Sequence, residues 1–356
     1  MLLSMGKEAS RAAINRLIRS FLRKNRSAGM RKSDPVQEAL KIIPQLSSVI
    51  SVQIETNHSG PSSHPSIPAL LDAAWTAVAN KISSLTFETY SEDLAAFLPA
   101  IHFGCLEDLT VRVYQFFPAT NTTAILQAHL PTLLQRHHQT LKRLALHIYE
   151  DSTNLSTILQ TLPPFPHLQH FGFVQHFAHV DTTDLSGLFH LLSNQRSTLK
   201  SLDFYFPTIF GVFPPGEAFF GQGWCQVLLP RLETLKINFP VDWSEGFLRY
   251  LHQFSESLSS LVVISYAPIN SLVLDLVIPK FARLRHLHHL HLFVTSLNPD
   301  QLSVLASTLP RLHSLYLDCV YVSPDKDSTS THASQIVQVS DRIDLPSNAC
   351  LYTYLH

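Results

Sequence analysis

The hydrophobic residues of this chain recur in a fixed six-residue pattern. In the segment LHHLHL, which begins at Leu287, apolar residues occupy the first, fourth and sixth positions. The last three positions alternate between apolar and polar, which predicts a short β-strand with one buried face. The pattern occurs ten times, and its copies begin at Val49, Ile82, Leu106, Leu141, Leu168, Leu199, Leu232, Leu258, Leu287 and Leu312.

The segments between these copies have the periodicity of helices, with apolar residues three and four positions apart. Three such stripes are Leu185, Leu188, Phe189 and Leu192; Phe247, Leu248, Leu251 and Phe254; and Leu302, Leu305, Ala306 and Leu309. Ser244 and Asn298 precede two of the stripes and are predicted to cap the N-termini of helices. A proline two residues before a copy is expected to end the preceding helix and to turn the chain into the strand. The prolines in this position are Pro166, Pro230 and Pro310.

One strand and one helix therefore make up each repeated unit. Successive copies begin 24 to 35 residues apart, which overlaps the roughly 20 to 29 residues of leucine-rich repeats. A single unit cannot bury its own apolar face, so neighbouring units must stack into a solenoid. We predict an α/β leucine-rich-repeat solenoid, a horseshoe with a parallel concave sheet and a helical convex side.

The segment LPRLHSLYL, residues 309–317, resembles the repeats of fungal F-box-type leucine-rich-repeat proteins. The resemblance covers roughly residues 45–320. It implies a protein-binding module that recognises substrates for a cullin-type ubiquitin ligase. No F-box sequence, with its leading LP helix pair and tryptophan, is found before the repeats. The alternative is an interaction scaffold or receptor without a link to the ligase.

The pattern predicts three parts: an N-terminal extension or cap (residues 1–44), about ten irregular repeats (residues 45–322), and a polar loop with a C-terminal cap (residues 323–356). Residues 1–33 carry nine Lys or Arg and one acidic residue. Apolar residues from Ile14 to Leu22 follow helical spacing, which predicts a basic amphipathic helix. It is interpreted as a cap on the first repeat, as a mitochondrial presequence, or as a membrane-surface helix. The expected location is the cytoplasm or nucleus, with the mitochondrion as the alternative.

The histidines of the segment RLRHLHHLHLFV raise the question of a metal site. His289 and His291 lie on one strand face, but a catalytic zinc needs at least three protein ligands and a structural zinc needs four. Among the aligned positions of the neighbouring strands, only Asp318 could add a ligand, and it lies diagonally. We therefore predict solvent-facing histidines, with no metal ion and no cofactor. A zinc-dependent enzyme is the least favoured alternative.

The rest of the sequence shows none of the common catalytic motifs. The chain contains no GxSxG, HExxH or GxxxxGK[ST] segment, so no enzymatic activity is predicted. The formal net charge of −1 gives no reason to expect nucleic-acid binding. Four cysteines that form no CxxC pair are predicted to be small buried residues in a reducing compartment.

The predicted partner site is the C-terminal half of the concave face. The chosen positions are Tyr205, Lys236, His289, His291, Phe293, Tyr316 and Asp318. Aromatic side chains are favoured because binding energy concentrates in a few such anchors. The outward positions considered on the N-terminal strands are mainly Ser84, Thr86, Glu88, Asp108 and Thr110. Two alternatives stay open: the chosen residues form ordinary cross-strand pairs, or the aromatic segment 207–226 binds the partner. That segment is also interpreted as folding back onto the sheet edge.

Overall fold

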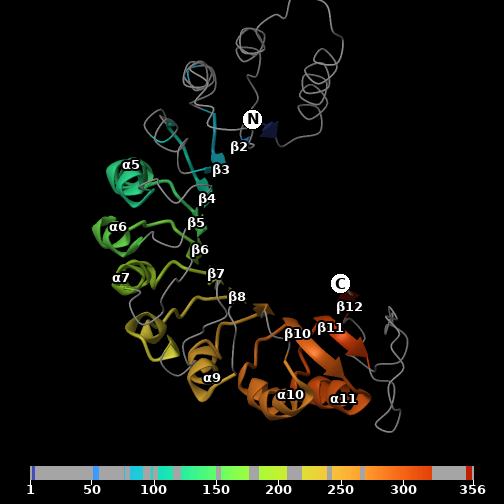
Figure 1. The fold of residues 1–356 in the computed structure, drawn as a ribbon. Coiled ribbons are helices and arrows are strands. Elements are labelled where there is room, and N and C mark those ends of the chain that lie inside the picture. The colour runs from blue at the N-terminus through green and yellow to red at the C-terminus, as the bar shows by residue number, and fades with distance from the viewer. Residues whose placement is uncertain are drawn as a thin grey trace, which may run out of the picture. The chain divides into compact units, whose positions relative to one another are not determined.

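The computed structural model (Figure 1) describes residues 2–4, 51–55, 76, 81–90, 98, 103–114, 122–149, 154–175, 184–206, 219–238, 243–264, 269–322 and 350–354. The chain divides into two compact units, Met1–Leu168 and Gln169–His356. Each unit is described by itself.

The N-terminal unit contains strands that pair in chain order. Strand β1 runs antiparallel to β2, and β2 to β5 are parallel. Helices α5 and α6 lie on one side of the strands (Figure 1). The elements are β1 (Leu2–Ser4), β2 (Ser51–Glu55), β3 (Ser84–Tyr90), β4 (Asp108–Tyr114), α5 (Thr122–His137), β5 (Arg143–Tyr149) and α6 (Ser156–Thr161).

The C-terminal unit repeats the same alternation of strand and helix. All of its neighbouring strands are parallel. The elements are β6 (His170–Gln175), α7 (Ser186–Gln195), β7 (Ser201–Tyr205), the 3-10 helix η4 (Gly223–Gln226), β8 (Thr234–Asn238), α9 (Glu245–His252), β9 (Ser260–Ile264), α10 (Ser271–Val277), the 3-10 helix η5 (Ile278–Arg283), β10 (His289–Leu297), α11 (Pro299–Thr308), β11 (Ser314–Val322) and β12 (Cys350–Tyr354).

All ten predicted strands, β2 to β11, are present, and each begins two residues after the start of its sequence pattern. The register aligns equivalent residues of successive repeats: Leu290 pairs with Leu261 on one side and with Leu315 on the other. These three leucines are buried. Each repeat therefore covers the apolar side chains of its neighbour, which is how such units become stable. The chain is an α/β leucine-rich-repeat solenoid, as predicted.

The predicted helix caps of the C-terminal unit are confirmed. The Oγ atom of Ser244 accepts a hydrogen bond of 3.3 Å from the backbone N–H of Phe247. The Oδ1 atom of Asn298 accepts from the N–H of Gln301 at 2.8 Å, and the Oε1 atom of Gln301 accepts from the N–H of Asn298 at 3.1 Å. This reciprocal pair satisfies two N–H groups that the first turn of α11 leaves without helical partners.

Replacing Asn298 by alanine is expected to lower the free energy of unfolding by about 1 kcal/mol, because both capping bonds depend on the asparagine side chain or its conformation. Chemical denaturation followed by circular dichroism measures the change. Asn194→Ala is the matched control, since Asn194 is an exposed residue inside α7 whose amide contacts the side chain of His190. Equal losses in the two variants would contradict the capping role.

The helix stripes are confirmed for α9, where Phe247, Leu248 and Leu251 are buried. The stripe predicted for α7 is wrong at Phe189, which is 45% exposed, whereas Leu191 is buried. The buried face of α7 instead includes Leu188, Leu191 and Leu192, which together satisfy the spacing of three and four.

The predicted burial of the cysteines is wrong for Cys105. It is exposed, whereas Cys225 is buried. Cys105 lies in the bend before β4, between Phe103 and Leu106, which take the buried positions there. Burial raises the pKa of the Cys225 thiol well above its usual value.

Several predictions fall on segments outside the described residues. These segments include the basic helix around residues 14–22 and the greater part of the C-terminal cap. The predicted boundaries at residues 44 and 322 stay predictions. Within the described part of the chain, no helix has the length and apolar character needed to cross a membrane.

Candidate partner-binding site

Apart from β6, whose residues after His170 are all buried, the strands with described burial have one buried face and one face whose side chains are mostly half-buried or exposed. We call the second the half-exposed face. On β7 it consists of Ser201, Asp203 and Tyr205, and on β10 it includes His289, His291 and Phe293. The alternation of buried and half-exposed positions follows directly from the period of two in a strand.

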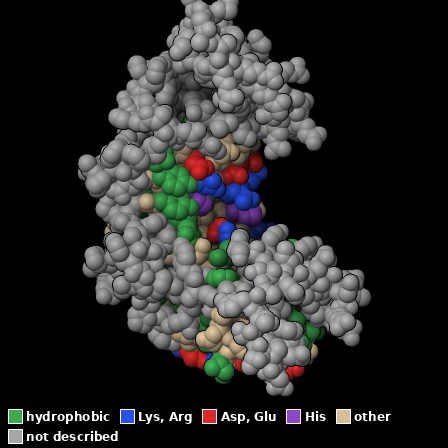
Figure 2. Space-filling model, turned by 45° about the vertical axis from the view of Figure 1, so that its right-hand side comes forward, with side chains coloured by type: hydrophobic (Ala, Val, Ile, Leu, Met, Phe, Trp, Pro, Cys, Tyr) green, Lys and Arg blue, Asp and Glu red, His purple; other side chains and the backbone are tan. Residues whose placement is uncertain are grey.

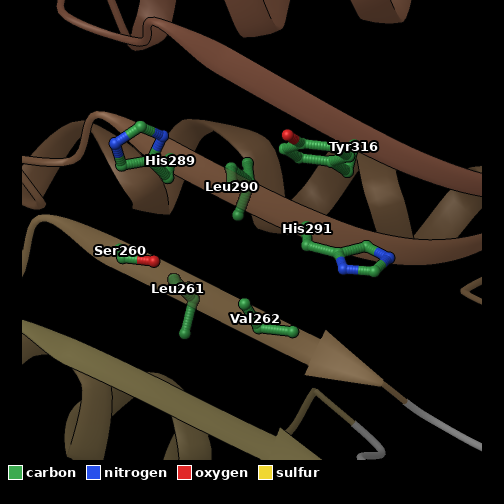
Figure 3. A pocket seen from close by; sticks show the side chains of 7 residues that line it. All are labelled: Ser260, Leu261, Val262, His289, Leu290, His291 and Tyr316. Carbon is green, nitrogen blue, oxygen red and sulfur yellow. The ribbon is translucent and has the colours of Figure 1, made fainter. Parts of the chain in front are cut away.

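The half-exposed face of β9, β10 and β11 contains an open depression of about 380 Å³ (Figure 3). Its lining residues are Ser260, Leu261, Val262, His289, Leu290, His291 and Tyr316. The rings of His291 and Tyr316 are 5.8 Å apart and tilted by 46°. The Nδ1 atom of His289 contacts the Oγ atom of Ser314. The structure therefore brings three of the predicted site residues, His289, His291 and Tyr316, around one depression.

The other predicted residues do not line this depression. Two lie on earlier strands, and two lie further along β10 and β11. Lys236 on β8 donates to the Oδ2 atom of Asp203 at 3.2 Å, and Tyr205 on β7 is aligned with Asn238. Phe293 is half-buried and is aligned with Asp318, whose side chain is not among those described. Tyr205 and Lys236 thus belong to a second group, on strands that precede β9.

The strand residues aligned with His289 and His291 on β9 and β11 include no His, Cys, Asp or Glu. Across the strands, His289 is aligned with Ser260 and Ser314, and His291 with Val262 and Tyr316. Among the described residues, no three His, Cys, Asp or Glu side chains are grouped so that they could hold a metal ion.

The N-terminal unit carries an aromatic surface that the sequence reasoning missed. Tyr90, Tyr114 and Tyr149 occupy equivalent positions on β3, β4 and β5. The rings of Tyr90 and Tyr114 are 6.0 Å apart, and those of Tyr114 and Tyr149 are stacked at 4.9 Å with 3° between their planes. We call these three residues the tyrosine row. The outward residues named from the sequence, such as Ser84 and Thr86, are half-buried on these strands, but the tyrosine row was not among them.

A sequence signal for the tyrosine row exists. The three strands end in ETY, RVY and HIY, so tyrosine recurs at one position in three successive repeats. The outward residues named from the sequence reach only Glu88, the fifth residue of β3, and Thr110, the third residue of β4. Both strands are seven residues long. Strand length is set by how far neighbouring repeats pair, which the six-residue pattern alone does not reveal.

Charged side chains support the tyrosine row from the adjacent positions. The Oε2 atom of Glu88 accepts from Nη1 of Arg112 at 3.1 Å, and its Oε1 atom accepts from the hydroxyl of Tyr114 at 3.0 Å. Partial burial, together with the hydrogen bond to Glu88 and the charge of Glu88, raises the pKa of Tyr114 to about 12. The phenol therefore keeps its proton at neutral pH and holds the Tyr114 ring in place as a donor.

A second ion pair lies nearer the start of these strands. Nε of Arg143 is 3.4 Å from Oδ2 of Asp108. Burial raises the pKa of Asp108, and the charge of Arg143 partly offsets this rise. Figure 2 shows acidic, basic and histidine side chains gathered side by side, next to a patch of hydrophobic side chains.

The structure also shows where part of the aromatic segment 207–226 lies. Phe219 and Phe220 are buried. The ring of Phe219 is 5.2 Å from that of Phe206, and the ring of Phe220 is 4.9 Å from that of Phe247 on α9. These two aromatics fold back into the core. Residues 207–218, including Phe210 and Phe213, lie outside the described part.

Comparisons of the sequence with known proteins gave no match. No family model matches the chain. No curated protein matches it either.

Comparison with solved structures found similar folds at low identity. A protein from Bacteroides fragilis is 12% identical, with a TM-score of 0.41 over 87% of this chain and 82% of that chain. A chain of the yeast complex of Rad7 and Elc1 is 13% identical, with a TM-score of 0.38 over 98% of each chain. An internalin, InlF, from Listeria monocytogenes is 14% identical, with a TM-score of 0.37 over 88% of this chain and 90% of that chain.

The stacked units of strand and helix, aligned leucine on leucine, define the class of this protein. It is a leucine-rich-repeat protein.

Proposed function

We propose that this chain is a protein-binding leucine-rich-repeat module whose partner occupies the half-exposed strand face. The observation that carries the proposal is the tyrosine row with its charged neighbours, in which three successive repeats present aromatic rings on one face. Solenoids recognise partners with extended surfaces to which each repeat contributes a few side chains.

Aromatic side chains suit this function because they offer large contact areas and lose little conformational entropy on binding. The hydrogen bond from Tyr114 to Glu88 fixes one ring before any partner arrives. Fixing a side chain beforehand reduces the entropy that association must lose. The depression formed by His289, His291 and Tyr316 supplies a second place for an inserted side chain.

The charges of the face favour a partner of mixed polar and aromatic character. Arg112 pairs with Glu88, Arg143 with Asp108, and Lys236 with Asp203. Each pair combines one positive and one negative charge, whereas a nucleic-acid surface needs a basic excess to neutralise phosphates. These half-exposed pairs contribute little to stability and are available to orient a partner.

Affinity capture with matched variants tests this function. We expect the wild-type chain to retain a partner that Tyr90→Ala/Tyr149→Ala or Phe293→Ala/Tyr316→Ala chains lose. The control is Leu272→Ala/Leu276→Ala on α10, where both leucines are exposed. The proposal fails if both strand-face variants still bind every protein that the wild-type chain captures and the α10 variant binds none of them.

The finer proposal is that the captured partner is a substrate for a cullin-type ubiquitin ligase. The resemblance of LPRLHSLYL to the repeats of fungal F-box-type proteins supports it. The alternative is a scaffold or receptor without a link to a ligase. Near-stoichiometric co-purification of a ligase adaptor with the chain supports the first proposal, and recovery of the partner without the adaptor supports the second.

A further inference from the structure

We propose that the turns preceding β10 and β11 form a binding site for an acidic segment of a protein partner. The site consists of His286 and His288 before β10, and of Arg311 and His313 before β11. It lies at the edge of the sheet where these strands begin, and is thus separate from the half-exposed face that the proposed function uses.

The equivalent position in earlier repeats shows what is unusual here. In two pairs of adjacent repeats, the second residues of the pattern carry opposite charges: Lys142 is 2.8 Å from Glu107, and Lys200 is 3.5 Å from Glu233. In the last two repeats this position holds His288 and His313 instead. Beyond the Lys200–Glu233 pair and Ser259, this position is thus occupied by two imidazoles in adjacent repeats.

The backbone fixes the two histidines next to each other. The N–H groups of His313 and Ser314 donate to the carbonyl oxygen of His288 at 2.8 and 3.0 Å. The same arrangement joins His288 and His289 to the carbonyl oxygen of Ser259. The rings of His288 and His313 are 4.9 Å apart and nearly perpendicular, at 88°. Two rings held this close by the repeat geometry can act on one ligand.

The surroundings of His288 are cationic. Burial lowers the pKa of His288, and the charges of His313, His289, Arg311 and His286 lower it further. No carboxylate is among the described groups that act on it. The turn before β9 presents Ser259, whose hydroxyl donates to the carbonyl of Glu233, and the exposed Glu256. The carboxylate of Glu233 is already paired with Lys200.

The chemistry of this site selects carboxylates rather than a metal ion. The described residues contain no group of three metal-ligating side chains, and a guanidinium beside the imidazoles repels a cation. Arg311 and His313 are exposed, so an incoming segment can reach them. Arginine binds carboxylates through paired hydrogen bonds, and a protonated imidazole adds a further charge-assisted donor. A run of Asp or Glu in a partner fits this set of donors.

A labelled hexaglutamate peptide tests the site directly, by fluorescence anisotropy at pH 7.5 and 5.5 in low salt. Glutamate side chains stay largely ionised at pH 5.5, whereas histidines become charged. We expect the wild-type chain to bind the peptide about tenfold more tightly at pH 5.5, because bound carboxylates raise the lowered pKa of His288 and so favour its protonated form. The variant His288→Gln/His313→Gln should lose most of this pH dependence, since only His286 remains in the site, and Arg311→Gln should weaken binding at both pH values.

The matched control is His129→Gln/His190→Gln, which removes two histidines from α5 and α7 and should keep the tenfold change. Hexaglutamine should not bind. The proposal is overturned if the His288 and His313 variant retains the pH dependence, if the control variant loses it equally, or if hexaglutamine binds as tightly as hexaglutamate. Because no protein partner enters this assay, its failure is distinguishable from failure of the proposed function.

Discussion

Replacing Phe247 by alanine is expected to lower the free energy of unfolding of the C-terminal unit by about 3 to 5 kcal/mol. Phe247 has no exposed surface. Its ring lies 4.9 Å from that of Phe220 and 5.1 Å from that of Trp243. The alanine variant would leave a cavity between α9 and the segment that precedes β8, and the surrounding rings cannot fill it without moving. Urea denaturation followed by circular dichroism measures the loss.

Phe189→Ala provides the control for this prediction, because it removes the same side chain from a helix of the same unit. Phe189 is 45% exposed, so its removal should lower the free energy of unfolding by less than about 1 kcal/mol. Similar losses in the two variants would show that α9 is not packed as described.

The second large effect concerns binding. For the partner captured by the wild-type chain, we expect either Tyr90→Ala/Tyr149→Ala or Phe293→Ala/Tyr316→Ala to weaken binding by about 2 kcal/mol or more, as removal of aromatic anchors does. The unfolding midpoint should change little, because Tyr90, Tyr149, Phe293 and Tyr316 are only half-buried. Isothermal titration calorimetry measures the affinity.

The control for binding is the apolar surface of α10. Leu272 is 77% exposed and Leu276 is 70% exposed, so the variant Leu272→Ala/Leu276→Ala removes comparable apolar area from the helical side. It should bind the partner with unchanged affinity. A loss of affinity in this variant alone would place the partner on the helices.

The strands were predictable from the sequence because each must alternate between a buried and a half-exposed position. Leu261, Leu290 and Leu315 show this: a shift of one residue in any of their strands would expose the leucine and bury its polar neighbour. The caps at Ser244 and Asn298 were predictable for a local reason, since the capping bonds reach only three residues along the chain.

The packing of the aromatic segment before β8 was less predictable. Phe219 contacts Phe206, and Phe220 contacts Phe247 and Tyr250. These contacts join residues that share no sequence period. The sequence was therefore compatible with two interpretations of the segment, a binding loop and a segment that folds back onto the sheet. The exposure of Phe189 has a similar cause, because the orientation of α7 depends on what packs beside it.

The candidate site was predictable in position but not in extent. The HxH spacing and the aligned repeats placed His289, His291 and Tyr316 near one another, and the structure confirms this arrangement. The tyrosine row depends on strands that continue to Tyr90, Tyr114 and Tyr149. How far such strands continue depends on pairing with both neighbours, which a single repeat does not encode.

The central claim, that the partner occupies the half-exposed strand face, is tested most directly by hydroxyl-radical footprinting of the chain with and without its captured partner. The oxidation of each side chain reports its access to solvent. We predict that the partner reduces oxidation of Tyr90, Tyr149, Phe293 or Tyr316 and leaves Phe189, Leu272 and Leu276 unchanged. Protection of Phe189, Leu272 and Leu276, with the strand residues oxidised as in the free chain, would contradict the claim.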